Sequence, residues 1–228
     1  MQVGVVSSSR GLVFRELYRA VEPWDVSFDV VTDRRCEIED VSGALGISWE
    51  RIEETDREAF SRRTAQRFAD RGIEYVMLFF NRIVSADLYR AFPTFNIHPS
   101  LLPAFPGFGT LKNARRSGVR FLGATLHLVT GEPDAGPIIG QACAPVPPGC
   151  STSCFDEMSF VQRVYLSMLT VELQRDSALT LDPAAGTVEL APQPYTPRCN
   201  PALRDPRLIR LLTQLEEERG IAVTQPPT

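Results

Sequence analysis

The feature that most constrains the fold is an unbroken apolar run, Tyr75-Val76-Met77-Leu78-Phe79-Phe80. A run of this length with no polar alternation indicates a strand that is buried on both faces of a sheet. Another short apolar run, Val3 to Ser7, ends at the polar loop Ser7-Ser8-Ser9-Arg10-Gly11 and is followed by a helical pattern from Phe14 to Val21. Strands that alternate with helices predict an α/β fold with a mainly parallel sheet flanked by helices.

The remaining elements follow from the same periodicities. We expect strands at 26–32, 47–52, 94–97, 124–129 and 138–144, and helices at 37–45, 56–71, 85–92, 155–173 and 206–219. The Pro-rich stretch 191–206 indicates an extended linker. We therefore predict a main α/β domain over 1–190 and a linker with an amphipathic helix over 191–228, which packs on that domain or forms a homodimer.

Composition excludes several kinds of partner. Among the 228 residues, 28 acidic side chains outnumber 24 basic ones, which argues against nucleic acid and against anionic membranes as partners. No run approaches the roughly 18 apolar residues of a membrane span, and no export signal follows Met1, so we expect a cytoplasmic chain. The five cysteines lack histidine partners at metal-ligand spacing, so we expect structural or incidental thiols and no metal.

Few residues can carry acid–base chemistry, because the chain has only two histidines, His98 and His127. Asn96 lies two residues before His98 where a predicted strand ends, so both side chains fall on one side if the strand continues. An amide and an imidazole that converge there can hold an oxyanion. Asp134 lies in a Gly/Pro turn that can place its carboxylate near the imidazole. His127 lies within a strand, and we expect it to be structural.

Two motifs in this region resemble one enzyme family. The stretch Asn96-Ile97-His98-Pro99-Ser100-Leu101-Leu102-Pro103 and the segment Gly123–Val129 running into Asp134-Ala135-Gly136 resemble the folate-dependent formyltransferases. Within that family the similarity is greatest to the glycinamide ribonucleotide branch. The resemblance implies a Rossmann-like fold, 10-formyltetrahydrofolate as formyl donor, and catalytic roles for Asn96, His98 and Asp134.

The resemblance also implies binding residues. It assigns Arg82, Ile83 and Val84, together with Glu132 and Asp134, to the folate, the first three largely through backbone groups. It assigns the acceptor to Gly11, Leu12, Val13, Arg57 and Pro99. The implied reaction is attack of a small-molecule amine on the formyl carbon, with Asn96 and protonated His98 stabilising the oxyanion and Asp134 assisting proton transfer.

Three loop positions depart from the family pattern. Leu12-Val13 stands where the glycinamide ribonucleotide enzymes have Ser-Asn, and Gly109 stands where a histidine is usual. Two side chains that would donate hydrogen bonds to a substrate phosphate are therefore missing. We expect the acceptor to be an amine other than glycinamide ribonucleotide, and to carry beside its amine an uncharged group that faces Leu12 and Val13. The alternatives are the purine-biosynthesis enzyme with a divergent loop, and a folate-binding protein or 10-formyl-folate hydrolase.

Overall fold

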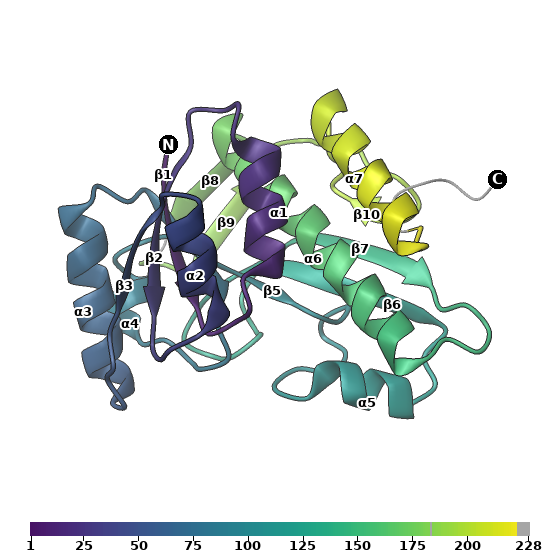
Figure 1. Ribbon diagram of the computed structural model, residues 1–228, viewed down its shortest axis with the longest axis horizontal. Helices are drawn as coiled ribbons and strands as arrows, with labels where there is room; N and C mark the ends of the chain where they lie inside the picture. Colours follow the sequence, from purple (N-terminus) through teal and green to yellow (C-terminus); the bar gives the residue numbers. More distant parts are fainter. Residues whose placement is uncertain (183, 223–228) are drawn as a thin grey trace. The chain divides into compact units, whose positions relative to one another are not determined.

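The structure is a computed structural model that describes residues 1–182 and 184–222 (Figure 1). It divides into two compact units that are described separately here. Unit 1 comprises Met1–Asn96, Leu128–Pro137 and Leu181–Val188. Unit 2 comprises Ile97–His127, Ile138–Thr180 and the residues from Glu189 onward. No helix in the described ranges is long and apolar enough to cross a membrane.

Unit 1 alternates strands and helices, as the apolar runs predict. The order is β1 (Gln2–Ser7), α1 (Leu12–Val21), β2 (Ser27–Thr32), α2 (Glu37–Ala44), β3 (Ser48–Arg51), α3 (Arg57–Asp70), β4 (Tyr75–Phe79), α4 (Ala86–Tyr89) and the first three residues of β5 (Thr94–His98). These strands pair in the order β3-β2-β1-β4-β5, and every pair is parallel. The mainly parallel α/β fold is confirmed.

Helices α1 and α3 cover opposite faces of the unit 1 sheet. Phe60 and Phe68 of α3 belong to one buried cluster with Val31 of β2. Phe28 of β2, three residues before Val31, instead meets Phe14 of α1 with ring centroids 5.2 Å apart. Successive side chains of a strand point to opposite faces, so the sheet is buried on both sides.

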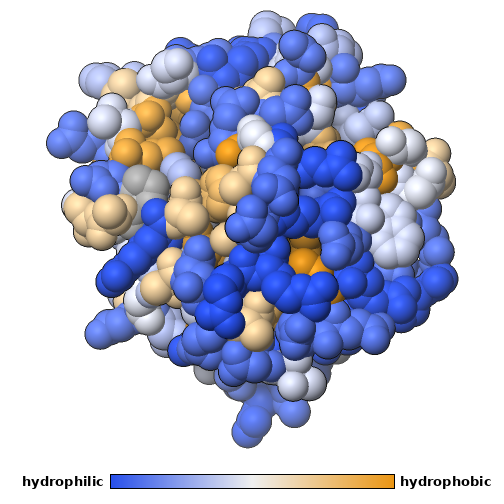
Figure 2. Space-filling model, turned by 90° about the vertical axis from the view of Figure 1, so that its left-hand side faces the viewer, coloured by the Kyte–Doolittle hydropathy of each residue, from blue (hydrophilic) through white to orange (hydrophobic). Residues whose placement is uncertain are grey.

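An ion pair fixes α3 to the sheet at the solvent boundary. The Arg67 guanidinium binds Asp29, with Nε 2.6 Å from Oδ2, and also contacts the Glu50 carboxylate. The Asp29 side chain is only 5% exposed, so this pair satisfies a buried charge. The outer face around α3 is mostly hydrophilic (Figure 2).

Unit 2 is built on antiparallel pairing. It contains α5 (Thr110–Arg116), the body of β6 (Phe121–Leu128), β7 (Ile138–Pro145), the long helix α6 (Thr152–Arg175), β10 (Cys199–Asn200) and α7 (Pro206–Arg219). Strand β7 pairs antiparallel with both β6 and β10. Strands β8 (Leu179–Asp182) and β9 (Thr187–Leu190) form a separate two-stranded sheet.

The Pro-rich stretch 191–206 is bound to other parts of unit 2 by backbone hydrogen bonds. Its β10 residues pair with β7, and the buried hydroxyl of Tyr165 on α6 donates to the Pro201 carbonyl at 3.0 Å. The Glu172 carboxylate of α6 accepts hydrogen bonds from the backbone N–H groups of Arg204 and Asp205. Burial raises the pKa of Glu172, although these backbone hydrogen bonds oppose the shift.

Helix α7 packs against α6 within unit 2. Its leucines Leu208 and Leu212 are buried, and Asp205 caps its first turn by accepting from the N–H groups of Arg207 and Leu208. At the other end, the Arg219 guanidinium lies 4.2 Å above the Phe160 ring of α6. The expectation that this helix packs on the rest of the chain is met, and a dimer through it remains a prediction.

The sequence predicts the long elements better than the short ones. The expected strands and helices are present, with α4 shorter than the expected 85–92 and β6 beginning at Phe121 rather than 124. Helix α5 and strands β8, β9 and β10 were not predicted. Each of these has at most seven residues, too few for periodicity to identify.

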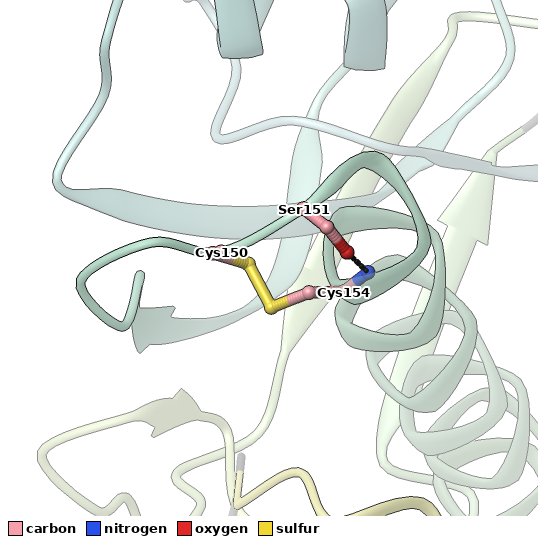
Figure 3. Close-up of a disulfide and its surroundings, with 3 residues drawn as sticks. All are labelled: Cys150, Ser151 and Cys154. Carbon is pink, nitrogen blue, oxygen red and sulfur yellow. Dashed lines mark hydrogen bonds between the residues drawn. A yellow bond between two sulfur atoms is a disulfide. The ribbon is translucent and has the colours of Figure 1, made fainter.

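A disulfide joins Cys150 to Cys154 at the start of α6 (Figure 3). Ser151 lies inside the five-residue ring and caps the helix, since its Oγ accepts from the Cys154 N–H at 3.2 Å. The expectation of thiols is therefore wrong for this pair. Cys36, Cys143 and Cys199 are free cysteines.

We expect reduction of this disulfide to destabilise the protein modestly. A five-residue ring restricts the unfolded chain by a free energy of about 2 kcal/mol at most. Urea denaturation with and without a phosphine reductant should show a lower free energy of unfolding in the reduced protein. A Cys150→Ser/Cys154→Ser variant should not respond to the reductant. Five titratable thiols in the denatured, unreduced protein, rather than three, would contradict the pairing.

Candidate active site

In unit 1, the carboxyl end of β5 brings Asn96 and Asp134 together. Asn96 pairs in register with Leu78 of the buried strand β4, which fixes its position. Its side chain is half-buried, and Nδ2 lies 3.5 Å from Oδ1 of Asp134. The two residues are 38 positions apart in the chain. The Asp134 carboxylate can therefore orient the Asn96 amide.

Asp134 is presented by a tight turn. Its φ is +54°, a left-handed conformation that aspartate tolerates better than most residues. The turn is closed by a hydrogen bond from the Leu128 N–H to the Pro137 carbonyl at 3.0 Å, and Val129 N–H donates to the Thr94 carbonyl of β5. The Asp134 turn is thereby attached to the strand that carries Asn96.

Gly136 is required where this turn closes. A Cβ atom at this position would lie 1.8 Å from the Leu128 carbonyl oxygen. No side chain can be accommodated at that distance unless the turn moves. Gly131, in the same turn, has no such restriction, because a Cβ there would be 3.6 Å from the Tyr89 hydroxyl.

In unit 2, His98 is buried, and its Nε2 atom lies close to two oxygen atoms. Its Nε2 lies 2.8 Å from the Phe105 carbonyl oxygen and 3.3 Å from Oγ1 of Thr110. Phe105 has a φ of +53°, an uncommon conformation for a bulky side chain, which persists only where the surroundings impose it. The turn that follows His98 therefore bends back toward the imidazole.

A second set of hydrogen bonds holds the segment that follows His98. The Thr125 hydroxyl of β6 donates to the Ser100 carbonyl at 2.7 Å and accepts from the Leu102 N–H at 3.0 Å. The Gln141 amide of β7 donates to Thr125 and to the Leu102 carbonyl. The supporting roles of Thr110, Thr125 and Gln141 were not predicted from the sequence. Their partners are mostly backbone groups, which no motif records.

The segment assigned to folate is an irregular loop after β4. The Arg82 guanidinium binds Asp33 and the carbonyls of Glu54 and Thr55, which anchors the loop within unit 1. Ile83 is 44% exposed, whereas Val84 is buried in the core. Within the described parts of the chain, the backbone N–H and C=O groups of 82–84 have no hydrogen-bond partner. Such groups can bind the polar edge of a heterocycle.

The residues assigned to the acceptor differ in accessibility. Gly11 caps α1 with a φ of +76°, and Leu12 is half-buried. Val13 is only 7% exposed and its side chain belongs to the core, and its assignment to the acceptor stays a prediction. Arg57 is exposed at the start of α3 and pairs with Glu58.

Pro99, assigned to the acceptor, and Glu132, assigned to the folate, both lie in loops, whereas His127 lies in a strand. Pro99 is half-buried and Glu132 is exposed, whereas His127 is buried in β6, as expected for a structural histidine.

Comparison with known proteins identifies one family. The family model described as "Formyl transferase" matches residues 4–158. The chain is 33% identical to the phosphoribosylglycinamide formyltransferase of Escherichia coli over 145 residues, covering 61% of this chain and 68% of that protein. It is also 33% identical to the formyltetrahydrofolate deformylase of Synechocystis over 109 residues, covering 46% of this chain and 38% of that protein.

Solved structures agree with this result. The glycinamide ribonucleotide transformylase 1 of Symbiobacterium toebii superposes with a TM-score of 0.76 at 27% identity, covering 84% of this chain and 94% of that chain. The first curated relatives are matched only in part, since the aligned region spans between 8% and 46% of their lengths.

We expect Gly136→Ala to disturb the Asp134 turn. The new methyl group would overlap the Leu128 carbonyl, and relieving such overlap typically costs about 1–3 kcal/mol. Urea denaturation should show this loss of stability. Gly131→Ala is the matched control and should change the free energy of unfolding by less than about 0.5 kcal/mol. Equal stability of the two variants would contradict the geometry described for the turn.

Proposed function

Since the chain belongs to the formyl transferase family, we propose that it transfers a formyl group from 10-formyltetrahydrofolate to the amine of a small molecule. We further propose Asn96, His98 and Asp134 as its catalytic residues. The observation that carries this proposal is the Asn96 amide held beside the Asp134 carboxylate, two residues before His98 on β5.

The proposed chemistry needs charge stabilisation and one proton transfer. A bond forms between the acceptor nitrogen and the formyl carbon, and the bond from that carbon to N10 of the folate breaks. Negative charge develops on the formyl oxygen, where the Asn96 amide and the protonated His98 imidazole can donate. The acceptor nitrogen loses one proton and N10 gains one, and the Asp134 carboxylate can assist this transfer, directly or through water.

The loop at 82–84 fits the folate. Its unpaired backbone groups supply donors and acceptors for a pterin edge, and the Arg82 ion pair with Asp33 keeps the loop in place without using them. The exposed Ile83 side chain adds an apolar surface beside these groups. When bound, the folate supplies the formyl group, and the residues of the chain bind and orient it.

For the acceptor we propose glycinamide ribonucleotide, one of the alternatives considered above. The solved transformylase of Symbiobacterium toebii is 27% identical over 84% of the chain, whereas a solved deformylase of Pseudomonas syringae covers the same share at 20% identity. Leu12-Val13 lacks the two side chains that donate hydrogen bonds to the substrate phosphate in the family. This loss argues less strongly against glycinamide ribonucleotide, because the Val13 side chain is buried. The N–H groups in the first turn of α1 have no partner within the helix and can hold a phosphate.

We expect Asn96→Ala and His98→Ala each to lower kcat for formyl transfer by about 10²–10³-fold, because each removes one oxyanion donor. The measurement is steady-state turnover of the formyl donor, with circular dichroism as a check of folding. Asn113→Ala, at an exposed asparagine of α5, is the control and should keep parental activity. Folded Asn96 and His98 variants that turn over within a few-fold of the parent would remove both residues from the mechanism.

A panel of acceptors tests the substrate. We expect turnover with glycinamide ribonucleotide to exceed that with its dephosphorylated riboside and with glycinamide, since only the first can use the helix N-terminus. If an uncharged amine is formylated faster, the acceptor is a different molecule and the departure at Leu12 sets specificity. If the donor is hydrolysed equally fast without any amine, the protein is a hydrolase.

A further inference from the structure

On its Nε2 side, the His98 imidazole contacts two oxygen atoms that act as hydrogen-bond acceptors. The Phe105 carbonyl oxygen, 2.8 Å from Nε2, cannot donate. The Thr110 hydroxyl, 3.3 Å from Nε2, has a single hydrogen and lies 2.8 Å from the Gly107 carbonyl. That hydrogen is therefore used toward Gly107, and the Thr110 oxygen presents a lone pair to the ring.

This arrangement decides where the imidazole proton resides. With hydrogen on Nε2, the ring donates to both oxygens. Without it, the Nε2 lone pair would face the carbonyl lone pairs in a buried site, where an unsatisfied polar pair is costly. His98 is only 4% exposed and Thr110 likewise, so water cannot easily intervene at this side of the ring.

We propose that Thr110 is a positioning residue for His98. Together with the Phe105 carbonyl it keeps a proton on Nε2 in every protonation state, so that Nδ1 is the nitrogen at which His98 gains and loses its proton. The catalytic consequence rests on the proposed function, because it assigns the proton exchange of formyl transfer to Nδ1. The tautomer itself does not depend on that function.

The local sequence supports this role for Thr110. It is the first residue of α5 and follows Pro106-Gly107-Phe108-Gly109, whose two glycines have φ values of +78° and +74°. These conformations let the chain reverse so that the Gly107 carbonyl meets the hydroxyl of Thr110, three residues later. The turn, the left-handed Phe105 and the hydroxyl thus act as one support around the imidazole.

Nitrogen NMR of histidine-labelled protein tests the tautomer directly. Only two imidazoles contribute, and the signals missing from His98→Ala identify those of His98. Across a pH titration we expect Nε2 to keep the shift of a protonated nitrogen, and any deprotonation to appear at Nδ1. Loss of the proton from Nε2, or a mixture of both tautomers in the parent protein, would overturn the proposal.

Variants of Thr110 test the positioning. Thr110→Val removes the hydroxyl at similar volume. Because the Phe105 carbonyl still accepts from Nε2, we expect the tautomer to be kept, the Nε2–H signal to shift as one of its two acceptors is lost, and kcat to fall about five- to tenfold, the effect of about one hydrogen bond, with little change in KM for the folate. Thr110→Ser should restore both properties. Thr152→Val, at the equivalent first position of α6 and exposed, is the control.

The outcomes separate the two proposals. A Thr110→Val protein with the parental Nε2–H shift and parental kcat would show that the hydroxyl has no positioning role. If Thr110→Val does not fold, the parent titration and Thr110→Ser still decide the matter. Absence of formyl transfer to every amine, with the Nε2 proton retained, would overturn the proposed function and leave the tautomer assignment standing.

Discussion

The parallel pairing of the unit 1 strands is the constraint on which the candidate site depends. Ser7 at the end of β1 is in register with both Thr32 of β2 and Phe79 of β4, and Leu78 of β4 is in register with Asn96. Parallel strands must all end at one edge, so the loops that follow them gather there. Polar contacts between sequence-distant loops result, such as that between Ser8 and Asn81, 73 positions apart.

This constraint explains why much of the fold could be predicted and where prediction failed. Strands buried on both faces are continuous apolar runs, so β1, β2 and β4 are visible in the sequence, and their ends locate the loops. Short elements are different. Strand β10 has two residues and exists because Tyr165 and Glu172 of α6 bind the backbone around it. The Cys150–Cys154 pairing was equally hidden, because five cysteines allow many pairings.

The candidate site likewise has residues that could be predicted from the sequence and others that could not. Asn96, His98 and Asp134 could be proposed because they have functional side chains within motifs that resemble a family. The role of the Phe105 carbonyl could not be predicted from the sequence, because every residue has a carbonyl. Only the left-handed conformation of Phe105 directs this one toward His98. Thr125 lies inside one of those motifs, yet its role depends on backbone partners at Ser100 and Leu102. A buried polar network whose members are satisfied fixes one arrangement of the loop.

The first loop shows how a backbone site can tolerate the side chains that replace Ser-Asn. The Ser9 hydroxyl accepts from the Gly11 N–H, and the Ser7 hydroxyl accepts from the Ser9 N–H, so the loop is held by its own serines. The N–H groups of the following first turn of α1 are separate from this network and have no intrahelical partner. An anion bound there would contact main chain whichever side chains follow Gly11. Its affinity would then depend little on the side chain of residue 12 or of the buried Val13.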